Sequence, residues 1–192
     1  MNHVMADIES CLAAGGGKDE ASIPFLVSRL RHEDWRVRYA AAIALGERRS
    51  VAAVPDLVAL LGEEDEAPLY SQKEELAGLP AGCNRTPQGR VPAGVPPDTA
   101  EAWRRRGRVK QAVCLALGLI GAAAAPAALP ALHRYATDQA EDYPVRAASC
   151  KALAQIADPS SLAVLTEATK DPEWCTATEA RKGAQSLAGP QP

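Results

Sequence analysis

The chain has 192 residues, a net charge of -3, and a single phenylalanine among many alanines. This length suits one domain or a short array of repeats. The charge gives no overall attraction to nucleic acid or anionic lipid, so binding of either kind would need a local patch. A core of alanine and leucine requires closely approaching helices, because small side chains fill space only where backbones come near one another. The composition therefore predicts an all-α fold of closely packed helices.

The five cysteines are an odd number, and neighbouring members lie at least 25 residues apart. This spacing offers neither a disulfide framework nor a cluster of metal ligands, and it predicts reduced thiols. Asp7 and Glu9 occupy positions where a signal peptide would need apolar residues, and no lipidation motif follows Met1. We therefore expect a cytoplasmic protein without a metal or cofactor.

Residues 1–20 precede the first repeat, and we expect them to form an N-terminal capping helix and a linker. Four later segments open with an aliphatic residue and place a leucine three residues further on, which is one face of a helix. They begin at Ile23, Val54, Leu129 and Leu162. Three of the four have proline at the second position, where the first turn of a helix tolerates it. They predict the first helices of four helix pairs.

A second set of segments lies between them and predicts the second helix of each pair. Three of these align without gaps: WRVRYAAAIALGE, GRVKQAVCLALGL and YPVRAASCKALAQ. In each, valine precedes a basic residue, and a leucine follows seven residues later at Leu45, Leu117 or Leu153. A fourth segment aligns through Leu187 but lacks the valine and the basic residue, as terminal repeats often do.

This pattern resembles the HEAT-like repeats of the short bacterial kind named after phycobilisome lyases. The first unit carries it at Asp34, Val37, Arg38, Ala41, Leu45 and Gly46, and the third at Asp142, Val145, Arg146, Ala148 and Leu153. The resemblance implies a short right-handed α-solenoid of about four HEAT-like helix pairs over residues 21–188, with residues 189–192 as a tail. It specifies the fold far more closely than the function.

An acidic and a basic residue recur at the start of the second helices. Asp34 lies four residues before Arg38, so it can cap the helix while facing the basic side chain. The resemblance implies a ladder of such contacts between stacked repeats. In the second unit Arg106 stands where the acid should be, which leaves that rung open. The residues assigned to repeat stacking are Asp34, Arg38, Lys110, Asp142 and Arg146.

The run from Ala112 to Leu132 has no charge in 21 residues, which is long enough to cross a bilayer. The alignment divides it into the end of a second helix, a turn marked by Gly121 and Pro126, and the next first helix. We therefore expect no membrane span. Cys114 aligns with Ala42, Cys150 and Ala184, a column that predicts a small buried side chain rather than a nucleophile.

The second helix pair contains an insert at about 63–106, because the first helices on either side start 75 residues apart instead of 31 or 33. Its proline and glycine density predicts an irregular segment. The acidic start and basic end of the insert could neutralise one another. Alternatively, Trp103, Arg104 and Arg105 could form a basic aromatic patch for phosphate or an acidic partner. Cys83 is either an incidental loop thiol or a reactive one.

In HEAT-like stacks the second helices line the inner curve, so their non-core positions form the expected contact surface. One such column contains Tyr39, Gln111, Ala147 and Arg181, and the next contains Ile43, Leu115, Lys151 and Gln185. We predict that this surface binds a helix or loop of another protein. The residues assigned to partner binding are Tyr39, Ile43, Gln111, Leu115 and Lys151, together with Trp103, Arg104 and Arg105.

No enzyme signature accompanies the repeats. His3, His32 and His133 have no carboxylate or thiol at a useful spacing, and no glycine-rich phosphate loop is present. Repeat stacks chiefly offer extended binding surfaces. The sequence therefore predicts a non-catalytic scaffold or accessory subunit that accompanies another protein, possessing no catalytic residue.

Two alternatives remain open. Relatives of this repeat type act as subunits that attach or remove bilin pigments on antenna proteins. The resemblance therefore implies, as one alternative, a bilin lyase-type subunit that acts on pigment proteins. The tryptophans invite comparison with DNA-binding HEAT-like proteins related to alkylpurine glycosylases, which use tryptophan and aspartate against a cationic base. However, Trp35, Trp103 and Trp174 do not share one repeat column, and the net charge is negative. We do not expect nucleic-acid binding.

Overall fold

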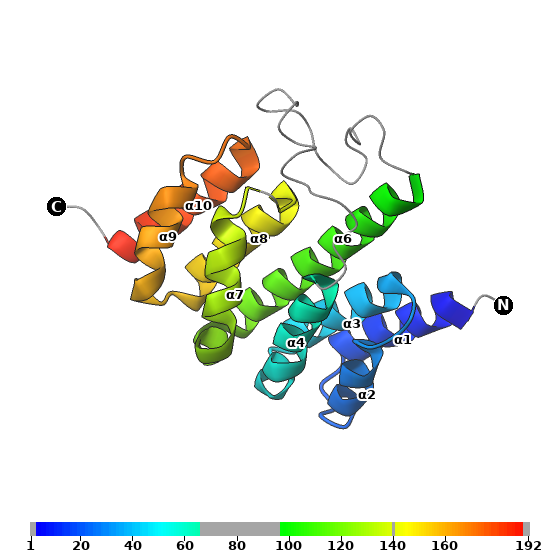
Figure 1. Ribbon diagram of the computed structural model, residues 1–192. Helices are drawn as coiled ribbons and strands as arrows, with labels where there is room; N and C mark the ends of the chain where they lie inside the picture. The colour runs from blue at the N-terminus through cyan, green and yellow to red at the C-terminus, as the bar shows by residue number, and fades with distance from the viewer. Residues whose placement is uncertain (1–2, 66–96, 140, 190–192) are drawn as a thin grey trace.

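The computed structural model shows a stack of helix pairs that runs from the N-terminus to the C-terminus (Figure 1). It describes residues 3–65, 97–139 and 141–189, with the side chains of all of these except residue 65 and residues 97–106. Within these ranges the secondary structure is helical, without a β-strand. The prediction of an all-α fold is confirmed.

The helices alternate between two layers. The first layer contains α2 (Ser22–Arg29), α4 (Val54–Asp65), α7 (Ala125–Thr137) and α9 (Leu162–Ala168). The second layer contains α3 (Trp35–Glu47), α6 (Pro97–Ile120), α8 (Tyr143–Ile156) and α10 (Trp174–Ala188). The short 3-10 turns η1 (Val51–Ala53), η2 (Gly121–Ala124) and η3 (Pro159–Ser161) lead into α4, α7 and α9.

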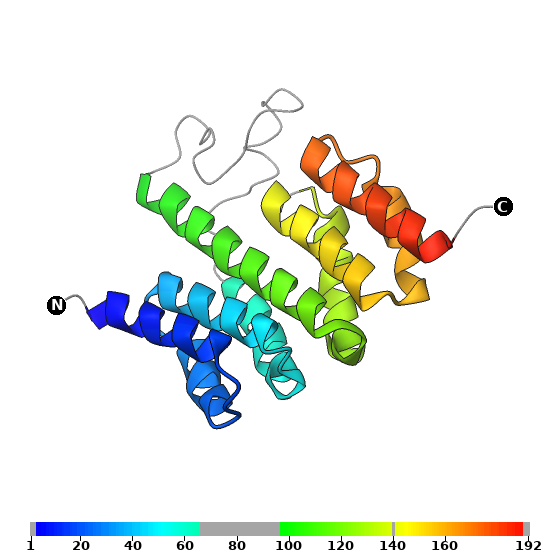
Figure 2. The same cartoon turned by 180° about the vertical axis from the view of Figure 1, so that it is seen from behind.

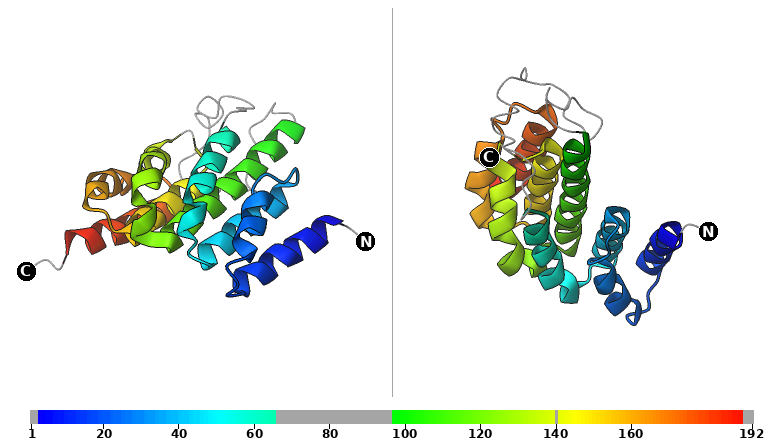
Figure 3. Two further views of the ribbon diagram at one scale, coloured as in Figure 1. Left: turned by 90° about the horizontal axis from the view of Figure 1, so that it is seen from below. Right: turned by 45° about the vertical axis from the view of Figure 1, so that its right-hand side comes forward.

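The second layer continues to the N-terminal end of the stack through α1 (His3–Gly16), which packs on α3. Each helix of this layer contacts the next, in the order α1, α3, α6, α8 and α10 (Figure 2). The two termini lie at opposite ends of the row (Figure 3). The first-helix leucines that the sequence placed on one face are fully buried: Leu26, Leu57, Leu132 and Leu165.

The second unit differs from the predicted irregular insert at both ends. Residues 63–65 complete α4, and residues 97–106 form the first turns of α6. The sequence at this point favours a helix start, because Pro97 needs no N–H partner in the first turn and Asp98 complements the helix dipole. Residues 66–96, with Cys83 and most of the prolines and glycines of the predicted insert, lie outside the described residues.

The long apolar run forms two helices rather than one. Gly107–Thr137 contains an 18-residue window with a mean hydropathy of 2.1, which is long and apolar enough for a membrane span but by itself is weak evidence for one. In the structure α6 ends at Ile120, Gly121 adopts φ 79, and α7 starts at Ala125. Ala112 and Leu117 are fully buried inside the stack. The predicted division of this run into two helices and a turn is confirmed, but α7 begins four residues before the predicted start at Leu129, so Pro126 and Pro130 lie inside the helix and not in the turn.

Small residues set the spacing between neighbouring second helices. A Cβ added to Gly46 would lie 2.6 Å from Cα of Ala116, and one added to Gly118 would lie 2.8 Å from Cα of Ala152. Both contacts are with backbone, so no side chain could rotate away to make room. The alanine-rich composition therefore reflects helices that approach closely, as the sequence predicted.

We predict that Gly46→Ala destabilises the protein, although alanine is the better helix former. Because the added methyl group would lie 2.6 Å from backbone, we place the strain in the upper part of the usual range for overpacking, about 2 to 3 kcal/mol. This exceeds the gain of about 1 kcal/mol in helix propensity. Urea unfolding followed by circular dichroism should show a net loss of about 1 to 2 kcal/mol.

Gly62 provides a matched control. It lies in α4, and an added Cβ would meet nothing within 4 Å. Gly62→Ala should therefore stabilise the protein by roughly 0.5 to 1 kcal/mol through helix propensity alone. Equal effects of the two substitutions would contradict the close approach at Gly46.

Candidate functional site

Buried ion pairs join consecutive repeats, and the most deeply buried one centres on Arg146 in α8. Its guanidinium is fully buried. Nε donates to Oδ2 of Asp171 at 2.7 Å, and Nη2 donates to Oδ1 at 3.0 Å. Nη1 donates to the backbone oxygen of Glu141. The Arg146 side chain therefore connects the loop before α8 to the loop before α10.

Arg38 in α3 and Lys110 in α6 make corresponding contacts in the first two units. Nε of Arg38 donates to Oε1 of Glu64 at 2.9 Å, and Nη1 donates to the backbone oxygen of His32 at 2.9 Å. Lys110 donates to the carboxylate of Glu141 and lies over the ring of Tyr135, 5.4 Å from its centre. Each basic residue of the predicted column thus reaches a carboxylate that follows it in the chain.

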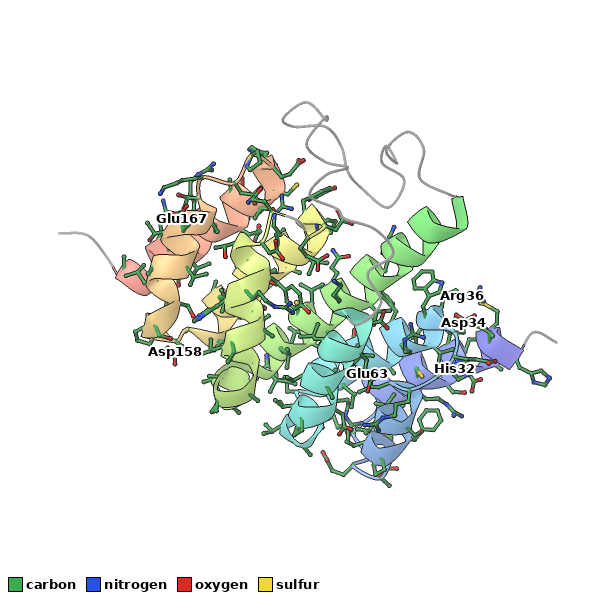
Figure 4. All side chains as sticks on the ribbon, in the orientation of Figure 1. His32, Asp34, Arg36, Glu63, Asp158 and Glu167 are labelled. Carbon is green, nitrogen blue, oxygen red and sulfur yellow. The ribbon has the colours of Figure 1, made fainter. Side chains whose placement is uncertain are left out.

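The structure corrects the predicted pairing of Asp34 with Arg38. Asp34 does cap α3, since its side chain accepts from the backbone N–H of Arg36 at 2.9 Å. Its Oδ2 accepts from Nη2 of Arg36 at 2.7 Å. Figure 4 labels both side chains at the start of α3. The half-buried Arg38 pairs instead with Glu64, which is 6% exposed. A guanidinium that is shielded from solvent is stable only beside a carboxylate that is buried with it.

The basic residues of the second and third units also make contacts that differ from the predicted ones. Asp142 is the N-cap residue of α8, but its side chain makes no capping bond and Arg146 pairs with Asp171. The second unit, in which Arg106 leaves no acid, does have a rung, because Lys110 pairs with Glu141. The acidic partner comes from beyond each second helix rather than from its own first turn.

These contacts hold α6, α8 and α10 around a surface groove of about 470 Å³. Its floor is α8, which contributes Pro144, Ala147 and Ala148. Small side chains on the central helix leave a hollow between longer side chains on the two neighbours. The floor is apolar, as expected for a binding groove.

Both polar and apolar side chains form the groove walls. Gln111 and Leu115 on α6 lie at predicted contact positions, and Lys151 continues the groove along α8. Cys175 and Glu179 on α10 form the opposite wall. The structure therefore brings three predicted partner-binding residues, Gln111, Leu115 and Lys151, to one groove.

The aligned column explains why the groove lies over α8. It contains Tyr39, Gln111, Ala147 and Arg181, and alanine is the only small member. The groove residues that the sequence did not place on the contact surface are Arg108, Tyr143, Pro144, Ala148, Cys175 and Glu179. The alanine at position 147, in a column of larger residues, was the sequence feature that could have located the groove.

Two other predicted partner-binding residues lie outside the groove. Tyr39 and Ile43 are half-buried on α3 and pack against the core, as Leu115 does on α6. Their role in binding a partner stays a prediction. Trp103, Arg104 and Arg105 lie in the first turns of α6, and their side chains are outside the described part of the chain.

The helix arrangement agrees with a comparison against protein families. The model of HEAT repeats matches residues 6–73 and 104–187. The chain belongs to the HEAT-repeat family. The match begins inside α1, the helix that takes a second-layer position. No curated protein matches the chain in sequence. The resemblance to the phycobilisome-lyase kind of repeat stays a prediction.

A buried carboxyl group lies next to the groove of this HEAT-repeat protein. Asp142 is 3% exposed, and its Oδ1 has no hydrogen-bond partner within the described residues. Burial and the nearby charge of Glu141 raise the pKa of Asp142 to about 7, although Arg146 and Lys110 act in the opposite direction. Its neighbour Tyr143, in the groove wall, also has a raised pKa, mainly because of burial.

The cysteines inside the stack act as small apolar side chains. Cys114 and Cys150 are fully buried, and the hydroxyl of Ser149 lies 3.4 Å from Sγ of Cys114. Burial, followed by the charge of Asp171, raises the pKa of the Cys150 thiol to about 12. That thiol is therefore protonated at neutral pH and inert as a nucleophile. Cys175 is the exposed thiol at the groove.

One histidine contact was not foreseen from the sequence. Nε2 of His133 lies 2.9 Å from Oγ of Ser161. Ser161 is fully buried, and the nearby carboxylate of Asp158 accepts from Ser160. The contact joins α7 to η3. Across residues 3–65, 97–139 and 141–189, no group of three or more His, Cys, Asp or Glu side chains could hold a metal.

We predict that Arg146→Met lowers the free energy of unfolding by about 3 to 5 kcal/mol, because Asp171 would remain as a buried charge without its partner. Lys182→Met is the control, since Lys182 makes an exposed pair with Glu179 at 2.7 Å. Exposed pairs contribute about 1 kcal/mol or less. Urea unfolding of both variants tests this, and similar losses would contradict the structural importance of the buried rung.

We predict that Asp142→Asn stabilises the protein at pH 8 and has a much smaller effect at pH 5. The raised pKa means that the folded state holds a proton which the unfolded state releases near pH 4. The wild type therefore loses stability relative to the variant as the pH rises from about 4 to 7, by up to about 4 kcal/mol.

Urea unfolding of both proteins at the two pH values measures this difference. Asp158→Asn is the control, because hydrogen bonds from Ser160 lower the pKa of Asp158. That substitution should give no gain that grows with pH. An equal gain from Asp142→Asn at pH 5 and pH 8 would show that Asp142 is ionised throughout this range.

Proposed function

We propose that this protein is a non-catalytic scaffold or accessory subunit that binds a segment of another protein in the groove over α8. HEAT repeats generally serve as protein-interaction scaffolds, which supports this class of function. The observation that carries the proposal is the groove itself, with its apolar floor at Pro144 and Ala147 and with polar side chains in its walls. Such a combination provides both burial and orientation for a bound segment.

The dimensions of the groove suit a short stretch of polypeptide. Its lining on α8 runs from Tyr143 to Lys151, a rise of about 12 Å along the helix axis. The groove crosses three stacked helices, so a bound segment would contact α6, α8 and α10 together. A partner would thereby contact the second helices of the last three repeats, and the ion pair of Arg146 with Asp171 maintains the position of α8 relative to α10.

A scaffold role also fits the titratable groups inside the stack. The Ser161 hydroxyl is buried, and the Cys150 thiol is held protonated, so neither offers an accessible nucleophile. Reduced thiols of this kind suit a cytoplasmic protein, which we include in the proposal.

Neither alternative function gains a specific supporting observation. Trp35 and Trp174 begin α3 and α10, and α6 and α8 lie between those helices. This separation does not favour a glycosylase-like site in which tryptophans surround one base.

We predict that Ala147→Trp removes partner binding, because an indole ring would fill the groove. The matched control is Ala163→Trp, on the exposed side of α9. Tagged wild-type, groove-filled and control proteins would be purified from the native host and their bound proteins quantified by mass spectrometry. The expected partner is retained by the wild type and by Ala163→Trp and lost with Ala147→Trp. Thermal unfolding must show that both variants are folded, and a partner kept by Ala147→Trp would overturn the proposal.

A further inference from the structure

The groove carries two positive side chains that have no ion-pair partner among the described residues. Arg108 is half-buried on α6, and Lys151 is exposed on α8. In the repeat alignment Arg108 is equivalent to Pro144, so Lys151 lies seven residues further along the row. This places the two charges about 10 Å apart along the helix axes.

The acidic residue in the groove wall is already neutralised. Glu179 accepts from Nζ of Lys182 at 2.7 Å on the same helix. The first turns of α8 and α10 also reach the groove, but their N-cap residues, Asp142 and Glu173, are buried carboxyl groups. Any attraction of the groove for an anion would therefore come from the Arg108 and Lys151 side chains, without a contribution from the helix dipoles.

The spacing of the two charges suits an extended segment. Such a segment presents residues i, i+2 and i+4 on one face over about 13 Å. That length matches the lining of α8 from Tyr143 to Lys151.

We propose that the groove selects an extended acidic segment of the partner with the pattern acid, any residue, aliphatic, any residue, acid. The two carboxylates pair with Arg108 and Lys151, and the aliphatic side chain between them packs on Leu115 and Ala147. This inference rests on the proposed function, because it specifies the chemistry of the partner at the same groove. Charge pairs at the groove ends set register and selectivity, while the apolar centre provides most of the burial.

Selection from a phage-displayed library of random ten-residue peptides tests the inference. The targets are the wild type, Ala147→Trp, Ala163→Trp and the double variant Arg108→Glu/Lys151→Glu. We expect Asp or Glu on both sides of an aliphatic residue for the wild type and for Ala163→Trp. Ala147→Trp should enrich no such pattern, and the double variant should enrich Lys or Arg at the flanking positions.

A fluorophore on Cys175 gives a solution measurement, since this thiol is exposed at the groove whereas Cys11, Cys114 and Cys150 are buried. Cys83→Ser would prevent labelling elsewhere. A synthetic peptide with the enriched acidic pattern should bind the double variant at least about ten-fold more weakly than the wild type. Its affinity should also fall with salt, because exposed charge pairs are screened.

The outcomes separate the two proposals. Neutral or basic peptides that are enriched on the wild type and lost with Ala147→Trp would overturn the acidic pattern and leave the groove as a peptide site. A labelled single-stranded oligonucleotide that binds more tightly than the acidic peptide would assign the anion to a phosphate backbone and also overturn the pattern. If no peptide depends on Ala147, both the pattern and the proposed function are wrong.

Discussion

The buried guanidinium of Arg146 links the loops that introduce α8 and α10. It makes two parallel hydrogen bonds to Asp171 and a third to the backbone of Glu141, all inside the stack. A buried charge without its partner is strongly destabilising, so these loops have little freedom to separate. The relative position of α8 and α10, and therefore one side of the groove, follows from this contact.

Glu141 continues the network toward the N-terminus. Its carboxylate accepts from Lys110 in α6, while its backbone oxygen accepts from Arg146 in α8. The three helices that surround the groove are thus connected through two short loops, which contain Glu141 and Asp171, and two basic side chains. Small residues complete the geometry, because Gly118 lets α6 approach the backbone of Ala152. In the interior such small residues permit close packing; on the exposed side of α8, at Ala147, they leave a hollow.

Much of the fold could be predicted from the sequence, because each repeat reports the same local pattern. The spacing of leucines located the helix pairs, and the alanine column identified Cys114 and Cys150 as buried spacers. The acidic partners were missed because they lie in other repeats, 26 residues after Arg38, 31 after Lys110 and 25 after Arg146. A search for carboxylates at roughly one repeat length would have been the appropriate signal.

By itself the sequence determined which segments form helices, which faces are buried and that the chain is a stack of HEAT-like pairs. These properties depend on local periodicity and on side-chain size, and both are visible in one dimension. Only the tertiary structure decided that Gln111, Leu115 and Lys151 share a groove whereas Tyr39 and Ile43 lie outside it. It also decided that Arg108 and Lys151 have no ion-pair partner among the described residues. Exposure and charge pairing depend on distances between helices, which the periodicity of one helix does not specify.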